Sequence, residues 1–217
     1  MRKYRFLILG VVFLGLFISF CFWYSPMGGK LTQEEVDRYI ALASKVASPP
    51  DAKQQMLANL RSWCETDDGK PVYMLNLLRD YKQLNKYPGT PDFNGTPEQA
   101  NKLYEKNVMP FLLKRASFIA YYGKPVAKNL AGFAPEVNDF SEVLIVRYPN
   151  RRAFVDMMAD PAYAPVVVYK FMGTEMSIMP TESIAYLPDM RLVVGGLLLF
   201  IYMAIGWRRA ARSKTST

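Results

Sequence analysis

Two apolar segments, one near each end of the chain, place the strongest constraint on what this sequence can fold into. Residues 6–24 (FLILGVVFLGLFISFCFWY) and 192–207 (LVVGGLLLFIYMAIGW) contain no charged side chain. An apolar helix of about 20 residues crosses the hydrocarbon core of a bilayer. The second segment is slightly short, but Met190 extends its apolar face and the long side chain of Arg191 can reach the headgroups. We therefore predict transmembrane helices at 6–24 and 190–207.

The first segment has a second interpretation, because a basic start followed by an apolar run is also the pattern of a cleaved signal peptide. The run is long for a signal peptide, and no cleavage site of small residues follows it. Trp23 and Tyr24 suit the membrane interface, and Pro26 ends the helix just beyond them. We favour a retained anchor. In the second segment Gly195 and Gly196 either let another helix approach closely or reflect the ordinary frequency of glycine in membrane helices.

The net charge of +8 is concentrated at the two ends of the chain. Seven of these charges come from two short tails without acidic residues, namely Arg2, Lys3, Arg5, Arg208, Arg209, Arg212 and Lys214. Basic segments beside membrane spans stay in the cytoplasm. We expect residues 1–5 and 208–217 to be cytoplasmic and the central domain to be periplasmic, in a bacterial inner membrane. Because the central domain is nearly neutral, we expect no nucleic-acid partner.

The scarcity of metal-binding side chains excludes several classes of chemistry. The sequence contains no histidine and two cysteines, Cys21 and Cys64. Haem ligated by histidine, zinc sites containing histidine, Ser-His-Asp triads and all-cysteine clusters are therefore excluded. We expect no metal and no cofactor. Cys21 lies in the first apolar segment, so we also expect no intramolecular disulfide.

The region between the apolar segments predicts a helical part followed by an α+β domain. Residues 26–66 contain two amphipathic helices, the first opened by a Thr32–Glu35 capping box, and we expect them to form a stalk or cover. Residues 67–187 form the main domain. Strands are predicted at 71–79, 117–122, 142–148 and 176–186, with helices at 96–115 and from 150 onwards. The order β-α-β-β-α-β is that of a ferredoxin-like unit.

Three motifs resemble a known family. They are Pro71–Arg79 (PVYMLNLLR), Val146–Phe154 (VRYPNRRAF) and Ala159–Tyr163 (ADPAY). Over about residues 70–180 the chain resembles the dimeric α+β barrel proteins called domain-of-unknown-function thirteen-thirty. The resemblance implies a ferredoxin-like subunit whose sheet joins that of a partner, and hence a homodimer, but no known reaction. Related barrel families include cofactor-free monooxygenases, lactone isomerases, haem peroxidases and chlorite dismutases, and the missing histidine disfavours the two haem branches.

Two polar residues of the first predicted strand are candidate ligand-binding residues. Asn76 interrupts an apolar strand, so its amide either bonds a neighbouring loop or faces a polar cavity, where it could orient a substrate carbonyl. We favour the structural role. Arg79 could bind a carboxylate, although an ion pair with Asp80, Asp139 or Glu142 is the interpretation we favour.

Three further candidates lie on later strands. Tyr121 and Tyr122 are adjacent, so one faces the core and the other points away. Either could hydrogen-bond an oxygenated substrate, and packing is the more common role of such a ring. Arg147 lies among apolar neighbours and needs a carboxylate, from Glu142, Asp156 or an acidic ligand.

Two functions are compatible with these features. The first is a membrane-anchored binding or assembly module that holds a lipophilic small molecule or a membrane-protein partner. The alternative is a cofactor-independent monooxygenase or isomerase that acts on a lipophilic substrate, and it rests on analogy with the barrel families.

The predicted orientation can be tested at the end of the chain. Because the basic tail should stay in the cytoplasm, alkaline phosphatase fused after Thr217 should be inactive and a fluorescent protein fused there should fold and fluoresce. Activity assays and fluorescence of the two fusions in intact cells measure this. An active phosphatase fusion would show that the C-terminus is periplasmic and would overturn the prediction.

Overall fold

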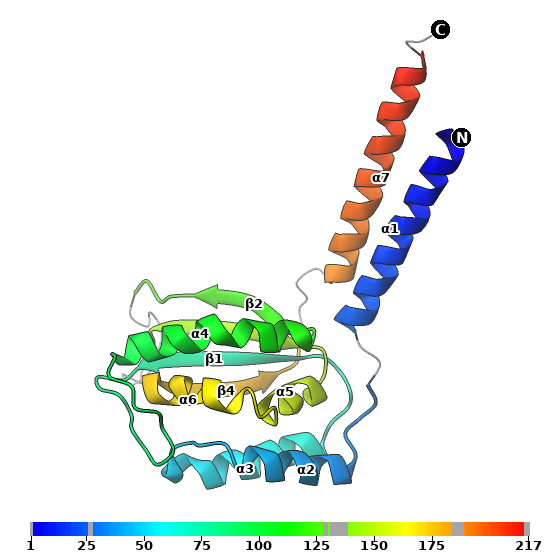
Figure 1. Cartoon of the computed structure of the whole chain (residues 1–217). Coiled ribbons are helices and arrows are strands. Elements are labelled where there is room, and N and C mark those ends of the chain that lie inside the picture. Colours follow the sequence, from blue (N-terminus) through cyan, green and yellow to red (C-terminus); the bar gives the residue numbers. More distant parts are fainter. Residues whose placement is uncertain (1, 26–27, 128–129, 131–138, 184–188, 215–217) are drawn as a thin grey trace. The chain divides into compact units, whose positions relative to one another are not determined.

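The computed structural model describes residues 2–25, 28–127, 130, 139–183 and 189–214. The chain divides into two compact units (Figure 1). One unit contains both ends of the chain, residues 1–27 and 184–217, and the other contains residues 28–183.

The first unit is a pair of long helices, α1 (Arg2–Tyr24) and α7 (Met190–Lys214). The stretches Phe6–Tyr24 and Met190–Ala211 are long and apolar enough to cross a membrane, with mean hydropathies of 2.6 and 1.8. This is compatible with a two-pass membrane protein.

The helices α1 and α7 contact each other through aromatic rings and glycines. The rings of Phe6 and Tyr202 stack with their centroids 4.4 Å apart. A Cβ atom at Gly195 would come within 2.9 Å of the Phe17 ring, whereas Gly196 faces open space. Of the two glycines in the predicted span, it is therefore Gly195 that permits the close approach of α1.

The second unit contains a four-stranded antiparallel sheet with helices against one face, and it is therefore α+β. Along the chain the elements are α2 (Gln33–Ala43), α3 (Pro50–Glu65), β1 (Val72–Asp80), α4 (Pro97–Lys114), β2 (Phe118–Gly123), β3 (Glu142–Tyr148), α5 (Arg151–Met158), α6 (Ala164–Gly173) and β4 (Thr174–Thr181). The strand order across the sheet is β2-β3-β1-β4. The predicted strand at 176–186 begins earlier and ends at Thr181, and its last residues, 184–186, lie outside the described residues.

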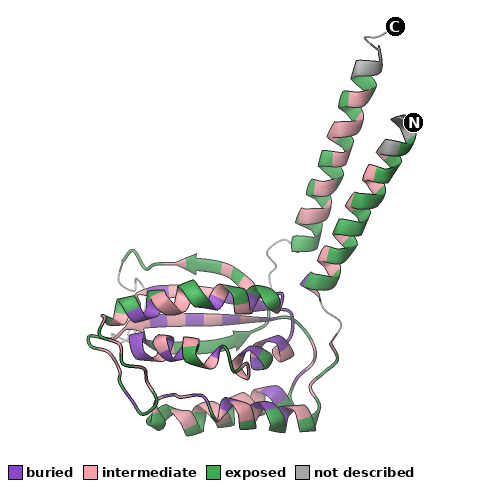
Figure 2. Cartoon of the chain, in the orientation of Figure 1, coloured by how far each residue is buried: buried purple, intermediate pink, exposed green. Residues whose placement is uncertain are grey.

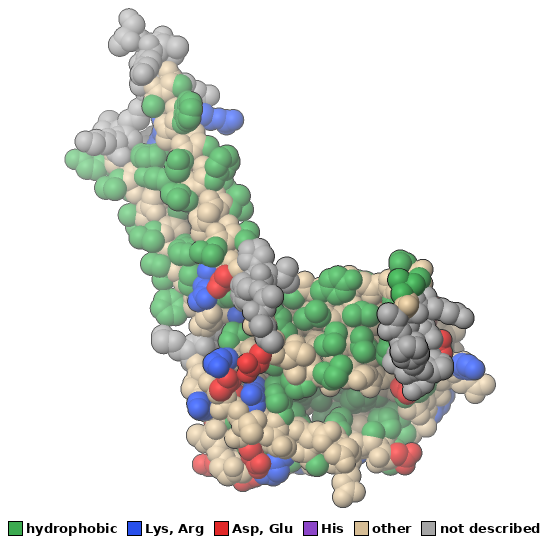
Figure 3. Space-filling model, turned by 180° about the vertical axis from the view of Figure 1, so that it is seen from behind, with side chains coloured by type: hydrophobic (Ala, Val, Ile, Leu, Met, Phe, Trp, Pro, Cys, Tyr) green, Lys and Arg blue, Asp and Glu red, His purple; other side chains and the backbone are tan. Residues whose placement is uncertain are grey.

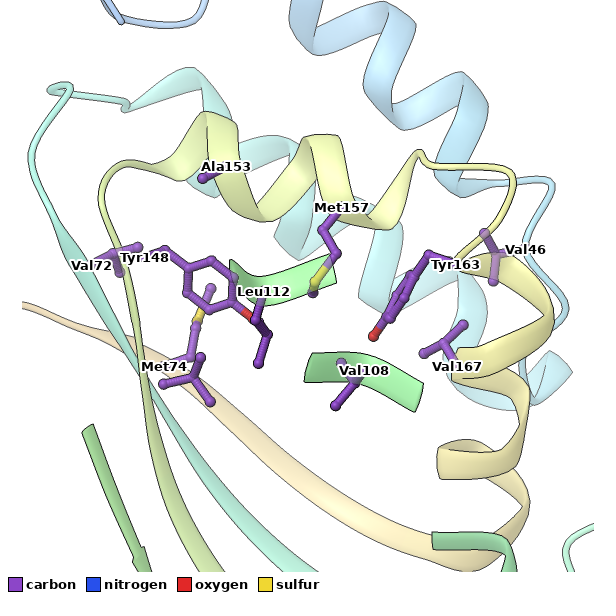
Figure 4. Packing of buried hydrophobic residues seen from close by; sticks show 11 residues of the cluster. Val46, Val72, Met74, Val108, Leu112, Tyr148, Ala153, Met157, Tyr163 and Val167 are labelled. Carbon is purple, nitrogen blue, oxygen red and sulfur yellow. The ribbon is translucent and has the colours of Figure 1, made fainter. Parts of the chain in front are cut away.

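The central strand β1 separates a buried face from an open face by strict alternation. Val72, Met74, Asn76 and Leu78 are buried, and the residues between them are half-buried (Figure 2). The buried face packs against α4, α5 and α6, and the side chains of this core point toward one another in Figure 4. The core contains Val46, Val72, Met74, Val108, Leu112, Val146, Tyr148, Ala153, Met157, Tyr163 and Val167.

The helices α2 and α3 are anchored to the domain through α5. The Thr32–Glu35 capping box predicted from the sequence is present at the start of α2. Glu35 also pairs with Arg152 of α5. On α3, the Trp63 ring packs edge-on against Phe154 with the centroids 5.6 Å apart. The two helices therefore belong to the same compact unit as the sheet.

Candidate functional site

A cavity of about 960 Å³ lies between the buried face of the sheet and the helices. Its walls are mainly apolar, and α3 contributes Met56, Leu60 and Trp63 to them. Figure 3 shows hydrophobic side chains gathered on one face of the domain, with a recess below them. Ligand pockets in proteins have volumes of about 300–1,000 Å³ and combine apolar walls with a few polar groups. The size and lining of this cavity match such a pocket.

One row of the sheet carries two polar side chains into the cavity. The register aligns Tyr122 of β2 with Leu144 of β3, Leu144 with Asn76 of β1, and Asn76 with Ile178 of β4. All four residues line the cavity. Asn76 donates a hydrogen bond from Nδ2 to the carbonyl oxygen of Met74 at 2.9 Å, which leaves its Oδ1 free to accept from the helix side.

That acceptor binds a buried lysine. Lys170 of α6 donates from Nζ to Asn76 Oδ1 at 3.0 Å, and its ammonium lies 5.3 Å from the centre of the Tyr104 ring. The side chain is 7% exposed. Thr174 anchors the end of α6 by donating from its hydroxyl to the carbonyl oxygen of Lys170 at 2.9 Å. Desolvation lowers the pKa of Lys170 to about 8.

The approach of α6 to α4 depends on a glycine. A Cβ atom at Gly173, the last residue of α6, would lie 2.5 Å from the carbonyl oxygen of Pro97 in α4. Because glycine has no side chain, the two helices come close enough to place Lys170 on the same side of the cavity as the polar residues of α4.

Two carboxyl groups complete the polar cluster. Tyr122 donates from its hydroxyl to Glu142 Oε1 at 3.0 Å. Asn101 donates from Nδ2 to Glu105 Oε1 at 3.1 Å and to Glu142 Oε2 at 3.4 Å. The Oδ1 atom of Asn101 is buried and accepts no hydrogen bond from the described residues. Buried acceptors of this kind are costly unless a ligand or water satisfies them.

The environment of Glu105 favours its protonated form. Burial, with smaller contributions from the hydrogen bond and the negative charge of Glu142, raises the pKa of Glu105 to about 7. Burial and Glu142 also raise the pKa of Tyr122 to about 12, so this hydroxyl keeps its proton and acts as a donor. The cluster therefore holds a carboxyl group and an amine that both titrate near neutral pH, the property expected of acid–base groups at functional sites.

Of the five residues predicted from the sequence, Asn76 and Tyr122 reach this cavity and the other three lie on the open face of the sheet. Arg79 pairs with Glu175 at 3.3 Å. Tyr121 is 53% exposed. Arg147 belongs to that face through its pairing with Tyr73, but its own side chain is buried. It donates to the carbonyl oxygen of Ala116 at 3.4 Å and lies over the ring of Phe118.

The carboxylates considered as partners of Arg147 are engaged elsewhere. Glu142 accepts from Tyr122 and Asn101, and Asp156 accepts from Arg115 at 2.6 Å. The three residues on the open face are therefore not brought together with the polar cluster.

Sequence reasoning missed three members of the site, namely Lys170, Asn101 and Glu105. Lys170 is the one charged residue of the helix sequence APVVVYKFMG, and such an isolated charge was a usable signal. Asn101 and Glu105 are one helical turn apart, which places them on one face of α4. Their burial was not visible in the mixed polar sequence of that helix. Within the described residues, no group of three or more His, Cys, Asp or Glu side chains could hold a metal ion.

Comparisons with known proteins support the fold. No protein family and no curated protein sequence matches the chain. A solved structure of RPA0582, a protein of unknown function from Rhodopseudomonas palustris, is similar with a TM-score of 0.50 and 22% identity, over 61% of this chain and 95% of that chain. The structure of the methylated RPA0582 protein gives a TM-score of 0.51 and 23% identity, over 61% and 92%. At this identity the likeness shows the fold alone.

The raised pKa of Glu105 predicts a pH-dependent gain in stability for the Glu105→Gln variant. Between pH 4.5, its ordinary pKa, and about 7, the unfolded chain loses this proton while the folded chain keeps it. The free energy of unfolding of the wild type therefore falls as the pH rises through this window. Glutamine does not ionise, so the variant should be more stable by about 1–3 kcal/mol above about pH 8 and nearly unchanged below about pH 4.5.

Urea denaturation of the full-length protein in detergent, followed by circular dichroism across this pH range, measures the effect. The control is Glu98→Gln on the same helix, because Glu98 is exposed and pairs with Lys102 at 2.8 Å. That variant should show no increase in the free energy of unfolding above about pH 8. Parallel pH profiles for Glu105→Gln and the wild type would contradict the prediction.

Proposed function

We propose that this protein is a membrane-anchored binding module whose cavity holds a lipophilic small molecule with a polar end. The observation that carries the proposal is the apolar cavity of about 960 Å³ with Asn76, Lys170 and Asn101 at its polar part. The cavity is partly open, because Tyr122 and Ile178, which line it, are also exposed. A partly open pocket of this size, with apolar walls and a few polar groups, has the character of a small-molecule site.

The two apolar helices support a lipophilic ligand. A domain tethered beside a bilayer has access to molecules that partition into lipid and are scarce in water. From the basic tails we propose an inner-membrane location with both termini cytoplasmic and the domain periplasmic.

We further propose that the domain is a ferredoxin-like subunit of a homodimeric barrel, as the resemblance to the thirteen-thirty family implies. The antiparallel order β2-β3-β1-β4, with α4 between β1 and β2 and the helices α5 and α6 between β3 and β4, supports this topology. The open face supports the pairing, because it carries apolar side chains at Leu75, Leu77, Tyr121, Ile145 and Met179. A second sheet would remove this apolar surface from water.

An enzyme is the second candidate, and the polar cluster gives it specific support. Glu105 has a pKa of about 7 and Lys170 a pKa of about 8, so both can exchange protons at neutral pH. Such groups suit a cofactor-independent isomerase or monooxygenase, which begins by moving a proton on its substrate. Tyr122 and Asn76 would orient an oxygen atom of that substrate.

Filling the cavity should remove the ligand. Leu144 lines the cavity from β3, so the Leu144→Phe variant should lose a small molecule that copurifies with the wild type, by about tenfold in occupancy. Native mass spectrometry of the full-length protein in a mild detergent measures the adduct. The matched control is Leu113→Phe on α4, because Leu113 is 48% exposed and does not line the cavity.

The same spectra test the rest of the proposal. An adduct retained at wild-type occupancy by Leu144→Phe, or lost equally by Leu144→Phe and the control, would contradict binding in the cavity. A wild-type monomer would contradict the dimer. A wild type that carries another membrane protein and no small molecule would favour the assembly function over ligand binding.

Deuterium exchange distinguishes binding from catalysis. If Glu105 transfers a proton to or from the bound molecule, the ligand released after incubation of the loaded protein in D2O should contain carbon-bound deuterium, and Glu105→Gln should prevent this. Mass spectrometry of the extracted ligand measures the exchange, and Glu98→Gln serves as the control. A ligand recovered without deuterium would leave the binding function and remove support for the enzyme.

A further inference from the structure

Lys170 is a buried charged group of the cavity that forms no ion pair with the described residues. Its Nζ makes one hydrogen bond, to Asn76 Oδ1 at 3.0 Å, although an ammonium group has three donors. Among the described residues, its polar partners are Asn76 and the Tyr104 ring, and neither carries a carboxylate. Glu105 and Glu142 act on it through space, at a longer range than an ion pair. A buried lysine usually has a paired carboxylate, so this arrangement calls for another partner.

The charges in the cluster favour an uncharged ligand group over a carboxylate. The described residues in and around the cluster include two amines, from Lys170 and Lys124, and three carboxyl groups, from Glu105, Glu142 and Asp80, with Lys124 3.8 Å from Glu142. Glu105 binds its proton near neutral pH, so two amines are balanced by two carboxylates. A ligand carboxylate would add a negative charge to this balanced set. A carbonyl group brings an acceptor without a charge.

We propose, on the basis of the binding function proposed above, that the ligand is a lipophilic aldehyde or ketone and that Lys170 binds it covalently as an imine. The neutral Lys170 nitrogen attacks the carbonyl carbon, and one of its two protons passes to the carbonyl oxygen to give a carbinolamine. Glu105 donates a proton to the carbinolamine hydroxyl, the C–O bond breaks and water leaves, and the second proton of the nitrogen returns to the Glu105 carboxylate. The balance is amine plus carbonyl compound giving imine plus water, with no oxidant or reductant.

The chemistry of the site supports each part of this step. Lysines that are desolvated in apolar pockets are those that form Schiff bases in enzymes, because the neutral amine is the nucleophile. The position of Lys170 on α6 is fixed from both sides, by the Thr174 hydroxyl on its carbonyl oxygen and by Asn76 on its nitrogen. The apolar walls built by β3, α3 and α4 would contain the alkyl chain.

Reductive trapping tests the proposal on the full-length protein in detergent. The probe is decanal, and sodium cyanoborohydride reduces any imine to a stable secondary amine. We expect one decyl group per chain, located at Lys170 by peptide mass spectrometry, forming roughly tenfold faster than at the exposed lysine Lys102. Modification of Lys170 at the same rate as Lys102, or none at Lys170, would overturn the proposal.

Three variants separate the covalent step from the structural role of the side chain. Lys170→Arg keeps the charge but cannot form the imine, so it should lose the rapidly formed adduct. Lys102→Met should keep it. Glu105→Gln should slow adduct formation, because glutamine has no acidic proton to donate, and an unchanged rate would remove Glu105 from the step.

A second probe detects binding in the cavity without imine formation, so it tests the binding function separately from the covalent step. Trp63 lines the cavity, and replacing Trp23 and Trp207 by phenylalanine leaves it as the remaining tryptophan. Bromodecanol cannot form an imine, but its bromine quenches a nearby indole. Quenching of Trp63 fluorescence without a decanal adduct at Lys170 would support ligand binding in the cavity and overturn the proposal of an imine at Lys170. Absence of both signals would overturn both proposals.

Discussion

The alternation of β1 is the constraint on which the rest of the domain depends. This strand lies between β3 and β4, so its hydrogen bonds fix the positions of both neighbours. Its buried side chains determine which face of the sheet receives α4, α5 and α6. Because Asn76 belongs to that buried set, a polar group enters the core at the point where the cavity forms. The partner of this amide is a lysine, which brings a charge into the same space.

A polar cluster of this kind lowers the stability of the core that contains it. A protein is expected to keep such a cluster where it serves a function. Burial shifts the pKa of Lys170 downward and that of Glu105 upward, so each charged form is disfavoured in the folded domain. Apolar residues at these positions would fill the space without this cost. Groups that conflict with the local demands of packing are expected at functional sites, and both proposals above depend on this argument.

The limits of the sequence are clearest on β2. Simple alternation identifies Tyr121 and Tyr122 as facing opposite sides, but it does not say which one faces the helices. A register irregularity between Ile119 and Tyr121 decides this, since it pairs Tyr122 with Leu144 in the row of Asn76. The sequence singled out Arg147 among apolar neighbours and Arg79 as a residue that binds a carboxylate or forms an ion pair. Pairing across the sheet placed both on the face opposite the cavity. The helix residues Asn101 and Glu105 gave no comparable signal, because a polar helix surface is the ordinary expectation.

By itself, the sequence determined the features that arise from local chemistry. These are the two apolar helices, the capping box at Thr32, the positions of most strands and the exclusion of histidine chemistry, each of which depends on residues close together in the chain. Tertiary structure alone decided the site. Lys170 hydrogen-bonds Asn76, which lies 94 positions away in the sequence, and Asn101 hydrogen-bonds Glu142, which lies 41 positions away. Both contacts result from the packing of α4 and α6 on the sheet. Such contacts form only when separate elements bury their apolar faces together, and a local pattern contains no information about them.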